Sequence, residues 1–305
     1  MVKYGLVFPG QGSQKVGMGA DLYESNSTVK EIFNQANQVL QRDLKEICFN
    51  GPSESLMLTT NTQPAIYLLS IAIYNVLAEY NIKPTLVAGH SLGELSAYCA
   101  SGVYSFKDGL EIIEARATAM ASSYPAEDSA MAAVIKLDKD KIEQGIEEFA
   151  NAPVVIANYN CPGQIVISGK KESVAKASDN LKKIGGRVIP LKVSGAFHSP
   201  LMEKGSNLLA QYIENISFSQ ANIPILLNRT AEKEVDADNL KDNLPKQIIS
   251  PVRWIEIINK MVAEVDIIIE CGPGSTLTGL IKKIAPDQEV INISDKETLE
   301  RFINR

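Results

Sequence analysis

Hydrophobic and polar positions follow two different patterns along the chain. In the first pattern, short apolar runs typical of strands alternate with longer segments whose apolar residues recur every three to four positions, as in helices. Such alternation favours an α/β fold built on a parallel sheet. The predicted strands are residues 4–8, 85–88, 224–227 and 265–270, and the predicted helices are residues 28–48, 64–80, 94–100, 106–122, 200–214, 245–264 (broken near 250) and 276–284.

The second pattern occupies the middle of the chain. Strands are predicted at residues 131–137, 154–159, 164–168 and 187–193, with helices at 138–150 and 172–184. The order β-α-β-β-α-β is the ferredoxin-like split pattern. We therefore expect a ferredoxin-like small subdomain, residues 127–195, inserted into a large α/β-hydrolase-like subdomain, residues 1–126 and 196–305.

The segment Gly89-His90-Ser91-Leu92-Gly93 lies between a predicted strand and a predicted helix. A strand, a Gly-x-Ser-x-Gly turn and a helix together form a nucleophile elbow. Its glycines allow the sharp turn, and the helix N-terminus would favour negative charge at the Ser91 oxygen. The alternative is a tight turn that carries an ordinary surface serine.

A serine nucleophile needs a base, and the chain has two histidines, His90 and His198. The side chain of His90 should diverge from that of its neighbour Ser91, so elimination leaves His198. This residue follows the small subdomain, at a junction where a cleft is expected. A structural histidine is the alternative. No acidic residue stands out as a third member, and a backbone carbonyl could orient the imidazole instead.

Composition limits the function classes. Hydrophobic residues make up 45% and charged residues 22% of 305 residues, with a net charge of −6. This is an ordinary globular composition without the basic stripe of a nucleic-acid binder. Four separated cysteines and two histidines argue against a metal site and favour free thiols in a reducing compartment. We found no secretory signal or membrane-length apolar run and expect a cytoplasmic enzyme.

The segment Pro9-Gly10-Gln11-Gly12-Ser13-Gln14 is a glycine-rich loop that follows the first predicted strand. It lacks the Gly-Lys-Ser/Thr of a phosphate-binding P-loop and the glycine spacing of a dinucleotide fold. Its backbone N–H groups could approach a ligand, or it could be a plain turn.

Seven motifs, in order and nearly from end to end, resemble malonyl-CoA:acyl-carrier-protein transacylases and the acyltransferase domains of polyketide synthases. They are Gly-Gln-Gly-Ser-Gln (10–14), Thr-Gln-Pro-Ala (62–65), Gly-His-Ser-Leu-Gly-Glu (89–94), Asn-Tyr-Asn-Cys-Pro-Gly-Gln (158–164), Gly-Ala-Phe-His-Ser-Pro-Leu-Met (195–202), Gln-Ile-Ile-Ser-Pro-Val (247–252) and Glu-Cys-Gly-Pro-Gly (270–274). Small departures from the common pattern are Cys161, where serine is usual, and Ala117, where glycine is usual.

The resemblance implies a ping-pong reaction without a bound cofactor. Ser91 would take the malonyl group from malonyl-CoA, and the phosphopantetheine thiol of holo-acyl carrier protein would take it from the serine, with His198 as base. The backbone N–H groups of Gln11 and Leu92 would form the oxyanion hole. Further roles are implied for Arg116, which would pair with the malonyl carboxylate, for Gln63, Asn160 and Phe197 in the substrate pocket, and for the main-chain carbonyl of Gln247, which would orient His198.

Several alternatives stay open on the sequence alone. The pathway is expected to be fatty-acid synthesis, and a trans-acting enzyme of polyketide synthesis is the alternative. An acyl-thioester hydrolase and a non-catalytic carrier-docking module compete less well. We expect a monomer that binds acyl carrier protein transiently. Candidate docking residues for this acidic partner are Lys182, Lys183, Arg187, Lys282 and Lys283, which could equally be ordinary solvated charges.

Overall fold

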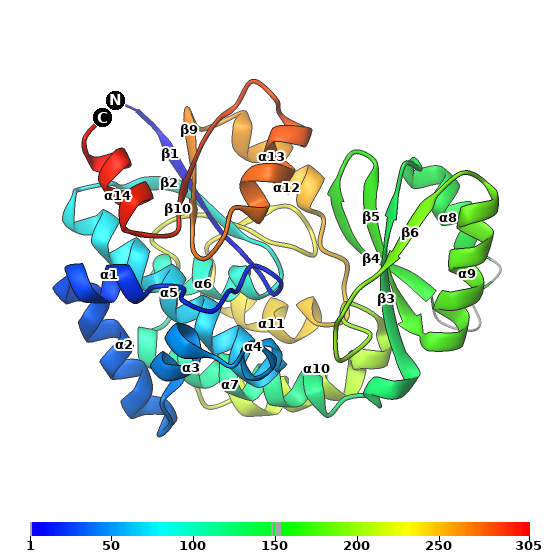
Figure 1. The fold of residues 1–305 in the computed structure, drawn as a ribbon, viewed down its shortest axis with the longest axis horizontal. Coiled ribbons are helices and arrows are strands. Elements are labelled where there is room, and N and C mark those ends of the chain that lie inside the picture. The colour runs from blue at the N-terminus through cyan, green and yellow to red at the C-terminus, as the bar shows by residue number, and fades with distance from the viewer. Residues whose placement is uncertain (1, 148, 150–153) are drawn as a thin grey trace.

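The computed structural model describes residues 2–147, 149 and 154–305. A six-stranded sheet organises the larger part of the molecule (Figure 1). Its strands, in spatial order, are β10 (Glu289–Ile293), β9 (Ile267–Cys271), β1 (Tyr4–Phe8), β2 (Pro84–Gly89), β7 (Ile225–Leu226) and β8 (Lys233–Glu234). All neighbouring pairs are parallel except β7 and β8. The predicted α/β fold with a parallel sheet is thus confirmed.

Helices cover both faces of this sheet, because each face buries its own apolar cluster. The longest helix, α5, lies between the sheet and the outer helices α2 and α7, which explains its continuous apolar sequence. The helices are α1 (Ala20–Ser25), α2 (Ser27–Leu40), α3 (Leu44–Asn50), α4 (Ser53–Met57), α5 (Thr59–Glu79), α6 (Leu92–Ala100), α7 (Phe106–Ala121), α10 (Glu203–Ile213), α11 (Ala237–Gln247), α12 (Trp254–Val262), α13 (Thr276–Ile284) and α14 (Lys296–Ile303).

The smaller part is an antiparallel sheet with two helices on one face, drawn in green in Figure 1. Its order is β4-β5-β3-β6, the ferredoxin-like arrangement that the sequence predicts. The elements are β3 (Ser129–Ile135), α8 (Lys139–Glu147), β4 (Val154–Cys161), β5 (Gln164–Lys170), α9 (Lys171–Lys183) and β6 (Arg187–Pro190). The predicted end of the first helix at residue 150 lies outside the described residues.

Two predicted helices are wrong in extent. Residues 28–48 form two helices, because Gln41 takes a positive φ of 51° and the Asp43 side chain caps the second helix. Helix α5 begins before Pro64 rather than at it. Proline leaves the carbonyl of Thr60 without its helical donor, and Arg42 Nη2 donates to that oxygen at 2.7 Å. A tertiary contact therefore makes the internal proline tolerable.

The C-terminal third departs most from the sequence prediction. The predicted helical region 245–264 is two helices, and the first begins at Ala237, with Pro245 close to its end. In this third, the strands β8 and β10 and the helix α14 were not predicted, and near the N-terminus the helices α1 and α4 were not predicted either. These elements are short, so their formation depends on neighbours already in place more than on local pattern.

The two parts meet beside the carboxyl ends of the central strands β1 and β2, since Gln11 and His90, which follow these strands, line one cavity with Met131 and Asn158. Next to this edge, β4 of the small sheet contacts α12 and α13 of the large part. Backbone bonds join the two parts, since Tyr159 N donates to Val252 O at 2.9 Å and Val252 N to Ala157 O at 2.8 Å. Among the described residues, no helix has the length and apolar character needed to cross a membrane.

Candidate active site

The elbow between β2 and α6 holds Ser91 in a strained backbone conformation. Ser91 has a φ of 52° and a ψ of −108°. A β-carbon on Gly89 would lie 1.9 Å from the carbonyl of Gly93, and a β-carbon on Gly93 would lie 1.9 Å from the carbonyl oxygen of Phe8. Both glycines are therefore required by close backbone contact, and the turn places Ser91 directly before the first residue of α6.

The hydroxyl of Ser91 contacts His198. Ser91 Oγ lies 2.7 Å from His198 Nε2, while His198 Nδ1 donates to the carbonyls of Gln247 at 3.1 Å and Ser250 at 3.0 Å. These two acceptors fix the proton on Nδ1 and leave Nε2 free to accept the serine proton. Burial, followed by the nearby charge of Arg116, lowers the pKa of His198 to about 3. The imidazole is thus neutral at neutral pH, as a general base must be.

The other histidine points elsewhere. His90 Nε2 donates to Asn160 Oδ1 at 2.9 Å, and the His90 ring packs edge-on against Trp254 with centroids 5.4 Å apart. The side chains of His90 and Ser91 diverge as the elbow geometry predicts. Asn160 is placed behind the site, where it contacts His90, whose ring lines the cavity in front of Ser91.

A buried cation lies beside the serine. Arg116 is fully buried on α7 and donates through Nη1 to Gln63 Oε1 at 2.8 Å and through Nη2 to Gln247 Oε1 at 2.9 Å. Its Nη2 is 3.5 Å from Ser91 Oγ. Burial lowers its pKa to about 10, so the guanidinium stays charged at neutral pH. Within residues 2–147, 149 and 154–305, no carboxylate forms an ion pair with it.

A cavity in front of Ser91 is shared by both parts of the molecule. The large part contributes Gln11, Gln63, His90, Ser91, Leu92, Arg116, Met120, Phe197 and His198. The small part contributes Met131 and Asn158, and the segment after β6 contributes Leu191 and Val193. Leu92 is the first residue of α6, so its N–H has no acceptor inside the helix. With Gln11 on the opposite loop, it can offer hydrogen bonds to an oxygen near Ser91.

Three residues of the site were not identified from the sequence. Asn228 Oδ1 accepts the backbone N–H of Ser91 at 2.7 Å, and Glu94 holds Asn228 in turn. The carbonyl of Ser250 shares the orientation of His198 with Gln247. Of these three residues, only Ser250 could have been identified from the sequence. It precedes Pro251, and a helix usually ends at or before the residue that precedes a proline, which leaves carbonyl groups there free to accept. Nothing local distinguishes Asn228, which follows a two-residue strand.

The part of the chain that the structure describes contains no group of three or more His, Cys, Asp or Glu side chains that could hold a metal ion. The arrangement around Ser91 instead combines a nucleophile, a neutral base, two candidate oxyanion donors and a cation. Such a set on a strand–turn–helix elbow is typical of enzymes that transfer acyl groups through a serine ester.

Comparison with known proteins agrees with this class. Residues 6–300 match the model of the acyl transferase domain, and the chain belongs to this family. It is 41% identical over 307 residues to a malonyl CoA-acyl carrier protein transacylase of Bacillus subtilis, covering 99% of this chain and 97% of that protein. The resemblance inferred from the seven motifs is thus confirmed.

Solved structures show the same fold. An acyl carrier protein S-malonyltransferase of Vibrio cholerae superposes with a TM-score of 0.95 at 39% identity, covering 98% of this chain and 99% of that one. A malonyl-transacylase in complex with a type II PKS acyl-carrier protein superposes with a TM-score of 0.96 at 37% identity, covering 99% of both chains.

Proposed function

We propose that this protein transfers the malonyl group from malonyl-CoA to the phosphopantetheine thiol of acyl carrier protein. The observation that carries the proposal is the position of Arg116, a buried cation 3.5 Å from Ser91 Oγ, which itself lies 2.7 Å from His198 Nε2. A malonyl thioester differs from an acetyl thioester by one carboxylate, and a planar guanidinium can bind that carboxylate through two hydrogen bonds. The relatives and their names support the same substrate pair.

In the first half-reaction, Ser91 Oγ attacks the thioester carbonyl while His198 Nε2 accepts the serine proton. The backbone N–H groups of Gln11 and Leu92 stabilise the oxyanion, a contribution worth about 3–4 kcal/mol for each such donor. His198 then donates the proton to the departing sulfur, coenzyme A leaves, and a malonyl-serine ester remains.

In the second half-reaction, the thiol of the carrier protein enters the site that coenzyme A has left. His198 takes the thiol proton, the sulfur attacks the serine ester, and Ser91 regains its proton as the malonyl thioester departs. Arg116 keeps hold of the carboxylate in both halves, so the acyl group has the same orientation toward the incoming nucleophile.

The remaining predicted residues support these steps. Gln63 and Gln247 hold the guanidinium through their side-chain oxygens, and the Gln247 carbonyl, with that of Ser250, fixes the tautomer of His198. Phe197 lines the cavity and limits the size of the group on the α-carbon. Asn160 acts one step away, because it orients the ring of His90.

The direct test is the Ser91→Ala variant with malonyl-CoA as substrate. We expect the wild-type protein to release one equivalent of coenzyme A in a burst and to gain a malonyl mass on Ser91, and the variant to do neither. Intact transfer by the variant would refute the proposal. Rapid loss of the adduct to water without carrier protein would indicate the acyl-thioester hydrolase instead.

We further propose the subdomain limits predicted from the sequence, residues 127–195 for the small and residues 1–126 and 196–305 for the large subdomain, which the two separate sheets support. Fatty-acid synthesis as the pathway, a monomeric state and a cytoplasmic location stay predictions. Offering carrier proteins of both pathways, light scattering and cell fractionation would test them.

A further inference from the structure

A buried carboxylate lies directly behind the elbow. Glu94 follows Ser91 by three residues, on the first turn of α6, and is completely inaccessible to solvent. Its Oε2 accepts the backbone N–H of Asn228, and its Oε1 accepts Asn243 Nδ2 at 3.0 Å. Glu94 does not cap α6, because both of its carboxylate oxygens accept hydrogen bonds from other segments of the chain.

Asn228 connects this carboxylate to the elbow. Its Oδ1 accepts the N–H of Ser91 at 2.7 Å, and its Nδ2 donates to the carbonyl of Gly89 at 2.6 Å. These bonds satisfy the backbone on both sides of His90, at the point where the strained turn leaves the sheet without regular partners. The Asn228 amide therefore holds the N–H side of the Ser91 backbone, while Gln247 Nε2 donates to the Ser91 carbonyl at 2.7 Å.

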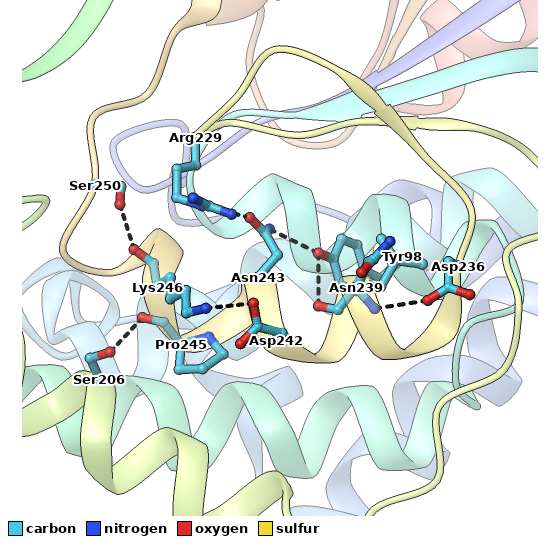
Figure 2. Close-up of polar contacts among 11 residues, drawn as sticks. Tyr98, Ser206, Arg229, Asp236, Asn239, Asp242, Asn243, Pro245, Lys246 and Ser250 are labelled. Atoms are coloured by element: carbon cyan, nitrogen blue, oxygen red, sulfur yellow. Dashed lines mark hydrogen bonds and ion pairs between the residues drawn. The ribbon is translucent and has the colours of Figure 1, made fainter.

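Asn243 closes the network on the other side. Figure 2 shows Asn243 on α11 between Arg229 and Tyr98. Its Oδ1 accepts Arg229 Nε at 3.2 Å, and its Nδ2 donates to Tyr98 Oη at 3.0 Å as well as to Glu94. Arg229 follows Asn228 directly in the chain. Glu94 of α6 binds Asn228 and Asn243 of α11 binds Arg229, so the two helices together hold this pair of consecutive residues.

Both oxygens of Glu94 face N–H donors, an arrangement that favours the ionised carboxylate, because that form accepts through both oxygens. Burial raises the pKa of Glu94 to about 7, and the bonds from Asn228 and Asn243 and the charge of Arg116 act in the opposite direction. Arg229 also contributes a positive charge. The donors and charges around Glu94 thus oppose the cost of burying its carboxylate, at a position that does not line the cavity.

We propose that Glu94 is a positioning residue for the nucleophile, which fixes Asn228 and through it the backbone and hydroxyl direction of Ser91. The inference rests on the proposed function, because it assigns the elbow geometry to acyl transfer. A carboxylate has the right chemistry for this task, since it accepts two bonds at once and its neighbours in the network are all donors toward it.

The first test is Glu94→Gln. The glutamine keeps one acceptor oxygen, but its NH₂ group would face either Asn228 N or Asn243 Nδ2, so that two donors would point at each other. We expect the rate constant of Ser91 acylation at saturating malonyl-CoA to fall about 10–100-fold, as small misplacements of catalytic groups do, while the KM for malonyl-CoA changes little. The matched control is Glu270→Gln, another buried carboxylate, which accepts from Leu277 and Thr278 on α13 and should leave the rate unchanged.

A polarity swap separates positioning from simple loss of stability. In Glu94→Gln combined with Asn243→Asp, the introduced glutamine would still accept from Asn228, and its amide would donate to the introduced aspartate. We expect the double variant to recover most of the lost acylation rate, whereas Asn243→Asp alone, with two facing carboxylates, should be impaired. Wild-type rates for Glu94→Gln, or a double variant as slow as that single variant, would overturn the proposal.

The reaction of Ser91 with a fluorophosphonate provides an independent readout, since this reagent needs no malonyl group. Its rate constant should fall in Glu94→Gln and recover in the double variant. Failure of the proposed function would be seen differently, as malonyl transfer that persists in Ser91→Ala, and the fluorophosphonate rates would still test the role of Glu94.

Discussion

His198 and Arg116 are both buried beside Ser91, and burial lowers the pKa of each. The consequences differ because their ordinary pKa values differ. His198 becomes a neutral base over the whole physiological range, while Arg116 remains a cation. The same low-polarity environment therefore yields a proton acceptor and a fixed positive charge within one site.

The pKa of His198 predicts how stability depends on pH. An unfolded histidine, with a pKa near 6.5, binds a proton that the folded His198, with a pKa of about 3, does not bind. Stability is therefore lost as the pH falls below about 6.5. We expect the unfolding free energy of wild type, relative to His198→Gln, to fall by about 2 kcal/mol between pH 7.5 and pH 5, measured by denaturant titration.

His90 and Glu94 also have shifted pKa values, but both proteins in this comparison contain them, so their effects cancel in the difference. A difference that stays constant between the two pH values would contradict the lowered pKa of His198.

Arg116 predicts selectivity for the acyl group. In Arg116→Ala, the malonyl carboxylate loses its buried partner, so kcat/KM for malonyl-CoA should fall by about 30-fold to 5,000-fold, as expected for 2–5 kcal/mol. Use of acetyl-CoA should fall much less. The matched control is Arg42→Ala, because Arg42 pairs with Glu114 away from the cavity. Equal losses for both substrates would remove the argument for carboxylate recognition.

At the scale of secondary-structure elements, the site depends on how closely α6 approaches β1. The backbone of Gly93 lies against Phe8, and His90 N donates to Phe8 O at 3.0 Å. The elbow can project Ser91 above the sheet only because no side chain separates the start of the helix from the neighbouring strand. Packing of main chain on main chain thus determines the height of the nucleophile.

The close approach predicts opposite outcomes for the same substitution at two helical glycines. Gly93→Ala would place a β-carbon 1.9 Å from Phe8 O and should lower the unfolding free energy by several kcal/mol or prevent folding. Gly279→Ala, on the exposed face of α13 with no atom within 4 Å of the new β-carbon, should stabilise by about 0.5–1 kcal/mol. Thermal unfolding of both variants would measure this, and similar melting temperatures would contradict it.

At the scale of the whole molecule, the two subdomains together form one cavity. Met131, Leu191 and Val193 line the same cavity as Ser91 and Arg116. Because the lining comes from both parts, we expect neither part alone to exclude water from the proposed serine ester. We therefore expect the carrier protein to deliver its thiol at the junction between the two parts, on the side where α13 contacts β4.

This geometry separates the candidate docking lysines. Lys283 lies on α13, and its charge acts on Cys161 at the end of β4, whereas Lys183 lies on α9, which covers the outer side of the small sheet in Figure 1. Because carrier proteins are usually acidic, Lys283→Glu should raise the KM for carrier protein several-fold, and Lys183→Glu should not. Equal effects of the two exposed substitutions, or none, would contradict docking at this junction.

The fold class, the elbow and the pairing of Ser91 with His198 could be predicted from the sequence because each has a local or countable signal. The Gly-x-Ser-x-Gly turn determines its own backbone, and two histidines leave little choice of base. Regular apolar spacing predicted the long helices, because this spacing is also a local signal. The single helix predicted at 28–48 was wrong because one residue, Gln41, breaks it in a conformation that composition does not indicate.

Tertiary structure alone decided which distant groups support Ser91. Asn228 and Asn243 lie 137 and 149 residues along the chain from the residues they bind, Ser91 and Glu94 respectively, so no local pattern marks them. Burial likewise decided the charge states of His198 and Arg116, because a pKa depends on the surrounding medium rather than on residue type. The sequence by itself determined the reacting groups, and packing determined their positions and their protons.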